Sequence, residues 1–117
     1  MTFARSGIGA AGGYSYSRVA NPTVDALERA LGTLEDAPPA VCFDSGLAAE
    51  ITLFLALLGD GGHAVVSDVV YGGTTRLLQQ VLARFGVAST FVDCTDLHSV
   101  RDALRPDTRL FFVETPA

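Results

Sequence analysis

The chain alternates between short apolar runs and longer stretches in which apolar residues recur at helical spacing. The apolar runs predict strands at residues 41–43, 64–67, 87–92 and 110–113. The helical spacing predicts helices at residues 47–58, 74–85 and 97–104. Strands and helices that alternate through short connections are typical of a mostly parallel sheet covered by helices. The pattern therefore predicts an α/β fold, with the helix at residues 47–58 so apolar that it should be buried on most sides.

The N-terminal part of the chain has a different character. Residues 1–20 show no sustained period and contain many Gly and Ser residues, which predicts an extended arm. Asn21 and Pro22 then supply an N-cap and a first helical residue. The helix that they open has four apolar positions on one face, at Val24, Leu27, Leu31 and Leu34. We therefore predict an arm at residues 1–20 and a domain at residues 21–117.

Composition narrows the classes of function. The 117 residues carry a net charge of −5, which argues against a surface for nucleic acid. The apolar stretch at residues 47–58 is too short to cross a bilayer. Cys42 and Cys94 lack metal-ligand spacing, so we expect reduced thiols and no metal site. A cytoplasmic protein with neither nucleic acid nor membrane as a partner is the default expectation.

The bend after the first predicted strand is a candidate site. A helix that begins directly after a strand leaves its first backbone N–H groups without partners, at the positive end of the helix dipole. Gly46 lets a ligand approach the backbone closely, so Ser45, Gly46 and Leu47 could seat a phosphate. The alternative is that Asp44 or Ser45 simply caps a core helix.

Two further candidates follow later strands. Ligands collect at the carboxyl ends of parallel strands, so these positions should share one cleft with the bend. Tyr71 follows the second predicted strand, and Gly72 and Gly73 permit a sharp turn that clears space before its ring. Such a tyrosine can stack on a planar cofactor and transfer a proton, unless it is only a partly buried loop residue. Glu114 follows the last strand and would add a carboxylate.

The arm carries a tyrosine and an arginine two residues apart, Tyr16 and Arg18. In an extended arm these side chains point to the same side, where a phenol and a guanidinium suit a phosphate. Because the arm precedes the domain, that phosphate could belong to a neighbouring subunit. The alternative is an arm that docks through its aromatic side chains.

Four motifs occur in the order and spacing of one known family. They are Tyr16-Ser17-Arg18-Val19-Ala20-Asn21-Pro22-Thr23, Ser45-Gly46-Leu47-Ala48-Ala49, Gly62-His63 with Tyr71-Gly72-Gly73-Thr74, and Val113-Glu114-Thr115-Pro116. Together they resemble the pyridoxal-phosphate enzymes of cysteine and methionine metabolism, such as cystathionine γ-synthase, cystathionine γ-lyase and methionine γ-lyase. The resemblance implies pyridoxal 5'-phosphate as the cofactor, a fold-type I large domain and a homo- or hetero-oligomer built as a dimer of dimers.

The resemblance also implies roles for individual residues. The cofactor-binding residues would be Tyr16, Arg18, Ser45, Gly46, Leu47 and Tyr71. The arm pair would reach the phosphate of the adjacent subunit, and the bend would offer its backbone amides. Leu47 stands where the family has methionine, which keeps the amide. Tyr71 would stack on the pyridine ring and act as the catalytic acid or base, and Gly73 replaces the cysteine of methionine γ-lyases, which favours the cystathionine enzymes or sulfhydrylases.

The sequence departs from the family in one decisive respect. All eight of its cationic residues are arginine, so it lacks the Schiff-base lysine on which the family's chemistry rests. We therefore expect residues 21–117 to be an incomplete large domain, without the lysine region and the small C-terminal domain. The function implied is the N-terminal piece of a lyase or transferase for sulfur-containing or homoserine-derived amino acids. It would act by β- or γ-elimination or replacement, and a complementary polypeptide or segment would carry the lysine.

Two alternatives stay open on the sequence. The first is a catalytically inactive fragment or interaction module of the same fold, which would be poorly soluble alone because it exposes an edge strand. The second is an unrelated small α/β protein that binds another phosphate ligand.

Overall fold

The structure, a computed structural model, describes residues 13–116. The chain divides into two compact units, Met1–Phe43 and Asp44–Ala117, and each is described here by itself. Residues 1–12 of the predicted arm lie outside the described residues, so the arm as a whole stays a prediction. Among the described residues, no helix has both the length and the apolar character that crossing a membrane would require.

The first unit is built on helix α1 (Pro22–Leu34). The side chain of Asn21 accepts hydrogen bonds from the N–H groups of Thr23 at 3.1 Å and Val24 at 3.0 Å, so the predicted N-cap is confirmed. Proline at the first helical position has no N–H to leave unpaired, and it follows this cap directly. Within this unit Leu27, Leu31 and Leu34 are exposed, because the described residues place no second apolar surface against them.

The strand predicted at residues 41–43 does not form. This segment belongs to the first unit, where the chain reverses after α1 and returns along it. The N–H of Ala40 donates to the carbonyl of Glu28 at 2.9 Å, and the N–H of Cys42 donates to the Glu28 carboxylate at 2.8 Å. The apolar pattern was therefore wrong here, because a strand needs a neighbouring strand and these N–H groups bond to a helix residue instead.

The second unit contains a parallel sheet, which confirms the predicted α/β class. Its strands are β1 (His63–Ser67), β2 (Ala88–Val92) and β3 (Thr108–Phe112), in the spatial order β2-β1-β3. Both neighbours pair with β1 in parallel, with Val65 opposite Thr90 on one side and Phe111 on the other. Each strand begins within two residues of its predicted start. Only β1 is buried along its whole length, whereas β2 is half-buried and β3 alternates between half-buried and exposed positions.

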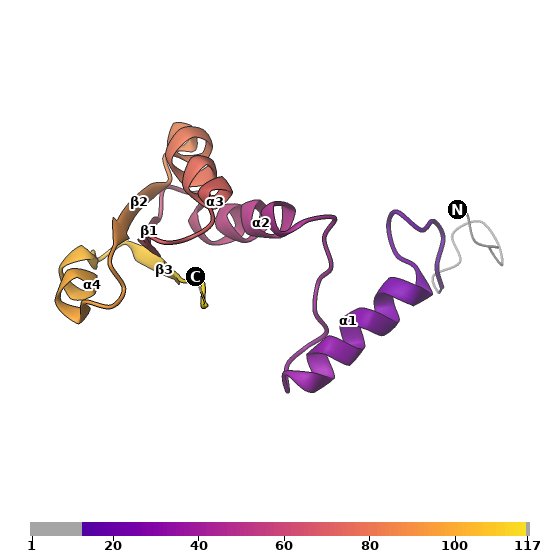
Figure 1. The fold of residues 1–117 in the computed structure, drawn as a ribbon. Helices are drawn as coiled ribbons and strands as arrows, with labels where there is room; N and C mark the ends of the chain where they lie inside the picture. Colours follow the sequence, from indigo (N-terminus) through magenta and orange to yellow (C-terminus); the bar gives the residue numbers. More distant parts are fainter. Residues whose placement is uncertain (1–12, 117) are drawn as a thin grey trace. The chain divides into compact units, whose positions relative to one another are not determined.

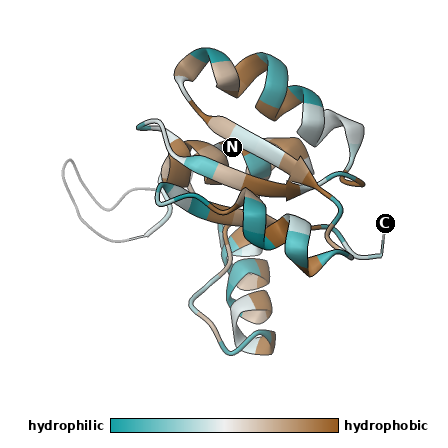
Figure 2. Cartoon of the chain, turned by 90° about the vertical axis from the view of Figure 1, so that its left-hand side faces the viewer, coloured by the Kyte–Doolittle hydropathy of each residue, from teal (hydrophilic) through white to brown (hydrophobic). Residues whose placement is uncertain are grey.

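Helices lie on both sides of this sheet (Figure 1). Helix α2 (Gly46–Leu58) and the helical stretch that begins with α3 (Gly72–Arg76) lie side by side, and α4 (Leu97–Ala103) lies across the strands from them. The buried core between the sheet and the first two helices contains Phe54, Leu58, Ala64, Val66, Val70, Leu78, Leu82 and Val87. Figure 2 shows hydrophobic positions on both the strands and the helices, with polar positions interspersed. This arrangement brings the first turns of α2 and α3 to the edge at which the strands end.

The helix predicted at residues 74–85 is not a uniform α-helix. After α3 the chain continues as a π-helical turn (Leu77–Val81) and a 3-10 turn (Leu82–Phe85). Gly86 follows with a left-handed φ of 83°, which confirms the predicted helix end. The apolar pattern missed the change because a five-residue π turn and a four-residue 3-10 turn are too short to show a hydrophobic period of their own.

Helix α2 is less buried than its composition predicts. Only Phe54 and Leu58 are fully buried, whereas the side chains of four leucines are 38–46% exposed, at Leu47, Leu53, Leu55 and Leu57. The prediction of burial on most sides is therefore wrong for this unit. One side of α2 faces the sheet, and the described residues of the unit do not cover the other.

Candidate functional site

The bend at the start of α2 has the donors that an anion needs. Ser45 is the N-cap, and its hydroxyl oxygen accepts a hydrogen bond from the N–H of Ala48 at 3.2 Å. Ser45 rather than Asp44 is therefore the capping residue. The N–H groups of Gly46 and Leu47 find no acceptor within residues 13–116, as expected for the first two residues of a helix.

These residues fit a phosphate group. A Cβ placed on Gly46 would have no atom within 4 Å, so the space beside this backbone is open. The two unpaired N–H groups lie at the positive end of a 13-residue helix, where a negative charge is stabilised. The phosphate of pyridoxal phosphate could therefore be bound by backbone amides and by the Ser45 hydroxyl, without a cationic side chain from this unit.

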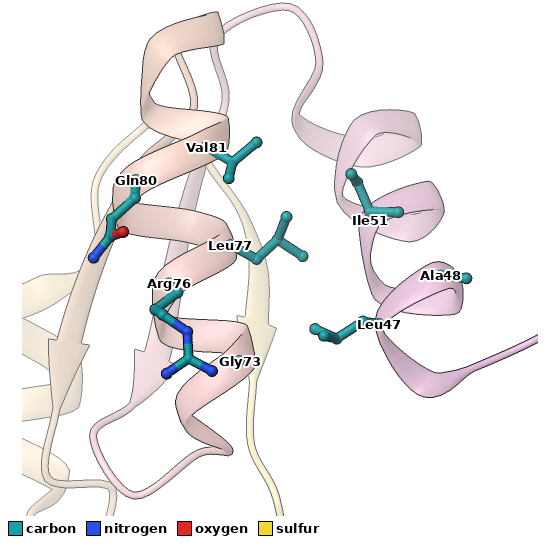
Figure 3. Close-up of a pocket in the computed structure, with 8 residues that line it drawn as sticks. All are labelled: Leu47, Ala48, Ile51, Gly73, Arg76, Leu77, Gln80 and Val81. Carbon is teal, nitrogen blue, oxygen red and sulfur yellow. The ribbon is translucent and has the colours of Figure 1, made fainter.

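A hollow of about 500 Å³ lies beside the bend, between α2 and the helical stretch that starts with α3. Its lining residues are Leu47, Ala48, Ile51, Gly73, Arg76, Leu77, Gln80 and Val81. In Figure 3, Leu47 and Ile51 lie on the side of α2 that faces Leu77, while the amide of Gln80 points away from α2. The hollow is therefore apolar between the helices, and its lining joins the bend to the segment of Tyr71.

Tyr71 lies immediately before α3, as its N-cap residue, and is 59% exposed. Its ring rests against Gly73, because a Cβ at that position would lie only 2.3 Å from a ring carbon. Its backbone N–H donates to the carboxylate of Glu114 at 2.9 Å. The bend, the aromatic ring and the carboxylate thus lie in one unit. Tyr71 and Glu114 follow β1 and β3 as the sequence predicts, whereas the bend does not follow a strand, because none forms at residues 41–43.

A second polar contact at this edge was missed from the sequence. The Thr74 hydroxyl in α3 donates to the carboxylate of Glu50 in α2 at 2.7 Å, and Thr74 is fully buried. The available signal was Glu50 itself, the single charged residue of an otherwise apolar helix. A charge at such a position usually has a specific partner.

Tyr16 and Arg18 lie in the first unit, close to one another. The N–H groups of Val19 and Ala20 donate to the carbonyl of Tyr16 at 2.9 and 3.1 Å, so this part of the chain forms a turn. The Arg18 guanidinium lies over the Tyr16 ring, 4.6 Å from its centroid. The pair is therefore brought together by a turn and a cation–π contact, and its phosphate-binding role stays a prediction.

Comparison with known proteins identifies the family of this chain. The family model for Cys/Met metabolism PLP-dependent enzymes matches residues 2–117. A probable cystathionine gamma-synthase of Herpetosiphon aurantiacus is 47% identical over 115 residues, which is 98% of this chain and 36% of that protein. The cystathionine gamma-lyase of Bacillus subtilis is 47% identical over 104 residues, which is 89% of this chain and 27% of that protein.

Solved structures give the same result. The crystal structure of metB from Corynebacterium glutamicum matches with a TM-score of 0.90 and 41% identity, over 99% of this chain and 30% of that one. The cystathionine gamma-lyase of Lactobacillus plantarum, complexed with L-serine, matches with a TM-score of 0.87 and 43% identity. This chain therefore spans about a third of the relatives that it matches. It belongs to the family of Cys/Met metabolism PLP-dependent enzymes.

Proposed function

We propose that this chain is the N-terminal, cofactor-binding part of a pyridoxal-phosphate enzyme. The enzyme would carry out β- or γ-elimination or replacement on sulfur-containing or homoserine-derived amino acids. The observation that carries the proposal is the open bend at Ser45, Gly46 and Leu47, whose amides have no acceptor among residues 13–116, beside a hollow that leads to the Tyr71 segment. The names of the relatives, cystathionine gamma-synthase and cystathionine gamma-lyase, support this class of substrate.

In this proposal the bend orients the cofactor through its phosphate. The amides of Gly46 and Leu47 would donate to phosphate oxygens, and the Ser45 hydroxyl would donate a third hydrogen bond while it still accepts from Ala48. The bound cofactor supplies an electron sink for the carbon atoms next to the amino group of the substrate. Because backbone donors are fixed by the helix, this part of the site would be preorganised before the cofactor arrives.

Tyr71 would serve in two ways. Its exposed ring has a face available for stacking on the cofactor ring, because Gly73 leaves room for the phenol beside α3. Its hydroxyl has no hydrogen-bond partner within the described part of the chain, so it is available to hold or transfer a proton at the substrate. Tyr16 and Arg18 would bind the phosphate of an adjacent subunit, as a phenol and a guanidinium together suit that group.

The lysine that anchors the cofactor would come from outside these 117 residues, since the sequence contains none. It could belong to a longer form of the same chain or to a separate polypeptide. In either case, the catalytic unit would be an assembly of this chain with a segment equivalent to the other two thirds of its relatives, within a homo- or hetero-oligomer.

Reconstitution tests the proposal. The 117-residue chain is mixed with pyridoxal phosphate and the part of the Bacillus subtilis cystathionine gamma-lyase that it does not match. The expected result is the absorbance band of enzyme-bound cofactor, together with cleavage or replacement on a sulfur amino acid. Tyr71→Phe should keep the band and lower turnover by roughly 10²- to 10⁴-fold, the usual contribution of a proton-transferring side chain.

The matching N-terminal piece of the Bacillus enzyme provides the positive control for this assembly. If that piece restores the band with the same complement and the present chain does not, the proposal is wrong. A band without turnover on any sulfur amino acid or homoserine ester would instead favour a catalytically inactive module that still binds the cofactor.

A further inference from the structure

Tyr71 is held at its backbone from two directions. Its N–H donates to Glu114 at 2.9 Å, across 43 residues of sequence. Its carbonyl accepts from the N–H groups of Thr74 at 2.9 Å and Thr75 at 3.3 Å, in the first turn of α3. Because both peptide groups that flank the Tyr71 Cα are bonded, the direction of its Cα–Cβ bond is fixed, and the ring leaves the backbone towards Gly73.

The ring itself has little else to hold it. It is 59% exposed, and no hydrogen bond to its hydroxyl occurs within residues 13–116. The contact with Gly73 limits how close the ring can come to α3, but it does not choose the direction from which the ring approaches. The position of the phenol therefore depends on the backbone bonds. Among residues 13–116, only the bond to Glu114 comes from outside the helix that follows Tyr71.

From these contacts we infer that Glu114 is a positioning residue for Tyr71. Its carboxylate, at the end of β3, holds the N–H of Tyr71 and thereby sets where the phenol lies relative to the bend at the start of α2. The inference rests on the proposed function, because it gives Tyr71 its orientation towards a bound cofactor. Glu114 itself does not touch the reacting atoms in this account.

A purely helix-capping role for Glu114 makes a different prediction. A carboxylate that only stabilised α3 would bond to the unpaired N–H groups of the first helical residues, Gly72 and Gly73. Within residues 13–116 neither of these groups has an acceptor, and the carboxylate bonds to Tyr71 instead. The hydrogen bond of Glu114 therefore acts on the backbone of Tyr71, the residue whose ring it orients, and not on the first N–H groups of α3.

The test uses tyrosine-specific ¹⁵N labelling of the 117-residue chain, which contains only Tyr14, Tyr16 and Tyr71. Glu114→Ala should move the Tyr71 amide resonance upfield and speed its exchange with water by about tenfold, the scale expected for the loss of one charge-assisted hydrogen bond. Glu114→Gln keeps an oxygen acceptor and should restore most of the protection. The Tyr14 and Tyr16 amides should stay unchanged in both variants.

Asp102→Asn supplies the matched control, because it removes one negative charge from an exposed position on α4. It should leave all three tyrosine amides where they are. A Tyr71 amide with the same shift and exchange rate in Glu114→Ala as in the unsubstituted chain would overturn the inference, and so would an equal change in Asp102→Asn.

A second readout separates this inference from the proposed function. In the reconstituted assembly, Glu114→Ala should keep the absorbance band of bound cofactor and lose most of its induced circular dichroism, which depends on the aromatic ring stacked against it. Glu114→Gln should recover the signal. Failure of the unsubstituted assembly to bind cofactor would refute the proposed function, while the amide measurement would still decide whether Glu114 positions Tyr71. Unchanged dichroism in Glu114→Ala would refute the positioning role alone.

Discussion

The hydroxyl group of Thr74 in α3 donates a hydrogen bond of 2.7 Å to the carboxylate of Glu50 in α2. Thr74 is fully buried and Glu50 is half-buried, so the bond is sheltered from competing water. It joins α2, which begins at the candidate phosphate-binding bend, to α3, which begins after Tyr71. The two halves of the candidate site are therefore tied by a polar contact as well as by apolar packing.

Removing the carboxylate should cost more stability than removing the hydroxyl. Glu50→Ala leaves the buried hydroxyl of Thr74 without its acceptor and should lower the free energy of unfolding by about 1–3 kcal/mol. Thr74→Val removes the donor, and Glu50 can then turn to water, so the loss should stay near 1 kcal/mol. Glu50→Gln keeps an acceptor and serves as the control. Urea unfolding measures all three, and equal losses for the first two variants would contradict this view of the contact.

A side chain added at Gly73 should displace the Tyr71 ring with little effect on folding. An added Cβ would lie 2.3 Å from a ring carbon, but the ring is exposed and can swing away. Gly73→Ala should therefore shift the Tyr71 ring signals and weaken cofactor binding in the reconstituted assembly. Gly72→Ala is the matched control, since its nearest neighbour would be the Arg76 guanidinium at an ordinary 3.7 Å. Identical ring spectra for the two variants would show that Gly73 has no such role.

The sequence predicts the three strands of the sheet correctly but also predicts a fourth strand, at residues 41–43, that does not form. The strands β1, β2 and β3 were found because each contains a short apolar run, although only β1 is buried along its whole length. The same signal failed at residues 41–43, where an apolar run had no strand beside it and Glu28 accepted its N–H. Pairing depends on which segment lies next to a run, and periodicity carries no information about that.

The candidate site was predictable in its parts but not in its connections. Motif spacing located the bend, and the strand ends located Tyr71 and Glu114, although the strand expected before the bend does not form. The bonds from Glu114 to Tyr71 and from Thr74 to Glu50 span 43 and 24 residues, and they depend on how the helices and strands are stacked. Side-chain contacts of this range become visible only after the elements have been placed in space.

A buried histidine links folding to pH. His63 in β1 is fully buried, with Nδ1 2.8 Å from the Thr108 hydroxyl and Nε2 2.9 Å from the Thr90 hydroxyl. Burial lowers the pKa of His63 below its ordinary value of 6.5, with a further lowering by Arg105 and an opposing effect of Asp107. Its pKa is therefore higher in the unfolded chain, which binds more protons as the pH falls below that value.

The contribution of neutral His63 to the free energy of unfolding should accordingly be fully present above about pH 6.5. It should decrease as the pH falls from this value towards the pKa of His63 in the folded chain. Urea midpoints of the unsubstituted chain should fall between about pH 7.5 and about pH 5.5. His63→Gln should be less stable at the higher pH and should lose part of this dependence. His98→Gln, at an exposed position, should keep it. An unchanged pH dependence in His63→Gln would show that another group is responsible.

The amides of the bend can be removed one at a time. Gly46→Pro deletes the N–H at the first position of α2, where proline is compatible with the helix. It should weaken binding of pyridoxal phosphate to the reconstituted assembly by about tenfold, the scale of one charge-assisted hydrogen bond. Leu97→Pro makes the same change at the first position of α4 and should leave binding unchanged. Equal cofactor affinity in both variants would place the phosphate elsewhere.

The most direct test of the central claim detects the phosphate at the bend. With ¹⁵N-labelled chain in the reconstituted assembly, phosphorus–proton correlations are recorded for bound pyridoxal phosphate. The account predicts correlations from the cofactor phosphorus to the amide protons of Gly46 and Leu47. It also predicts that the bound cofactor changes the chemical shifts of the Tyr71 ring. Bound cofactor whose phosphorus correlates with other amides, while those of Gly46 and Leu47 stay unperturbed, would contradict it.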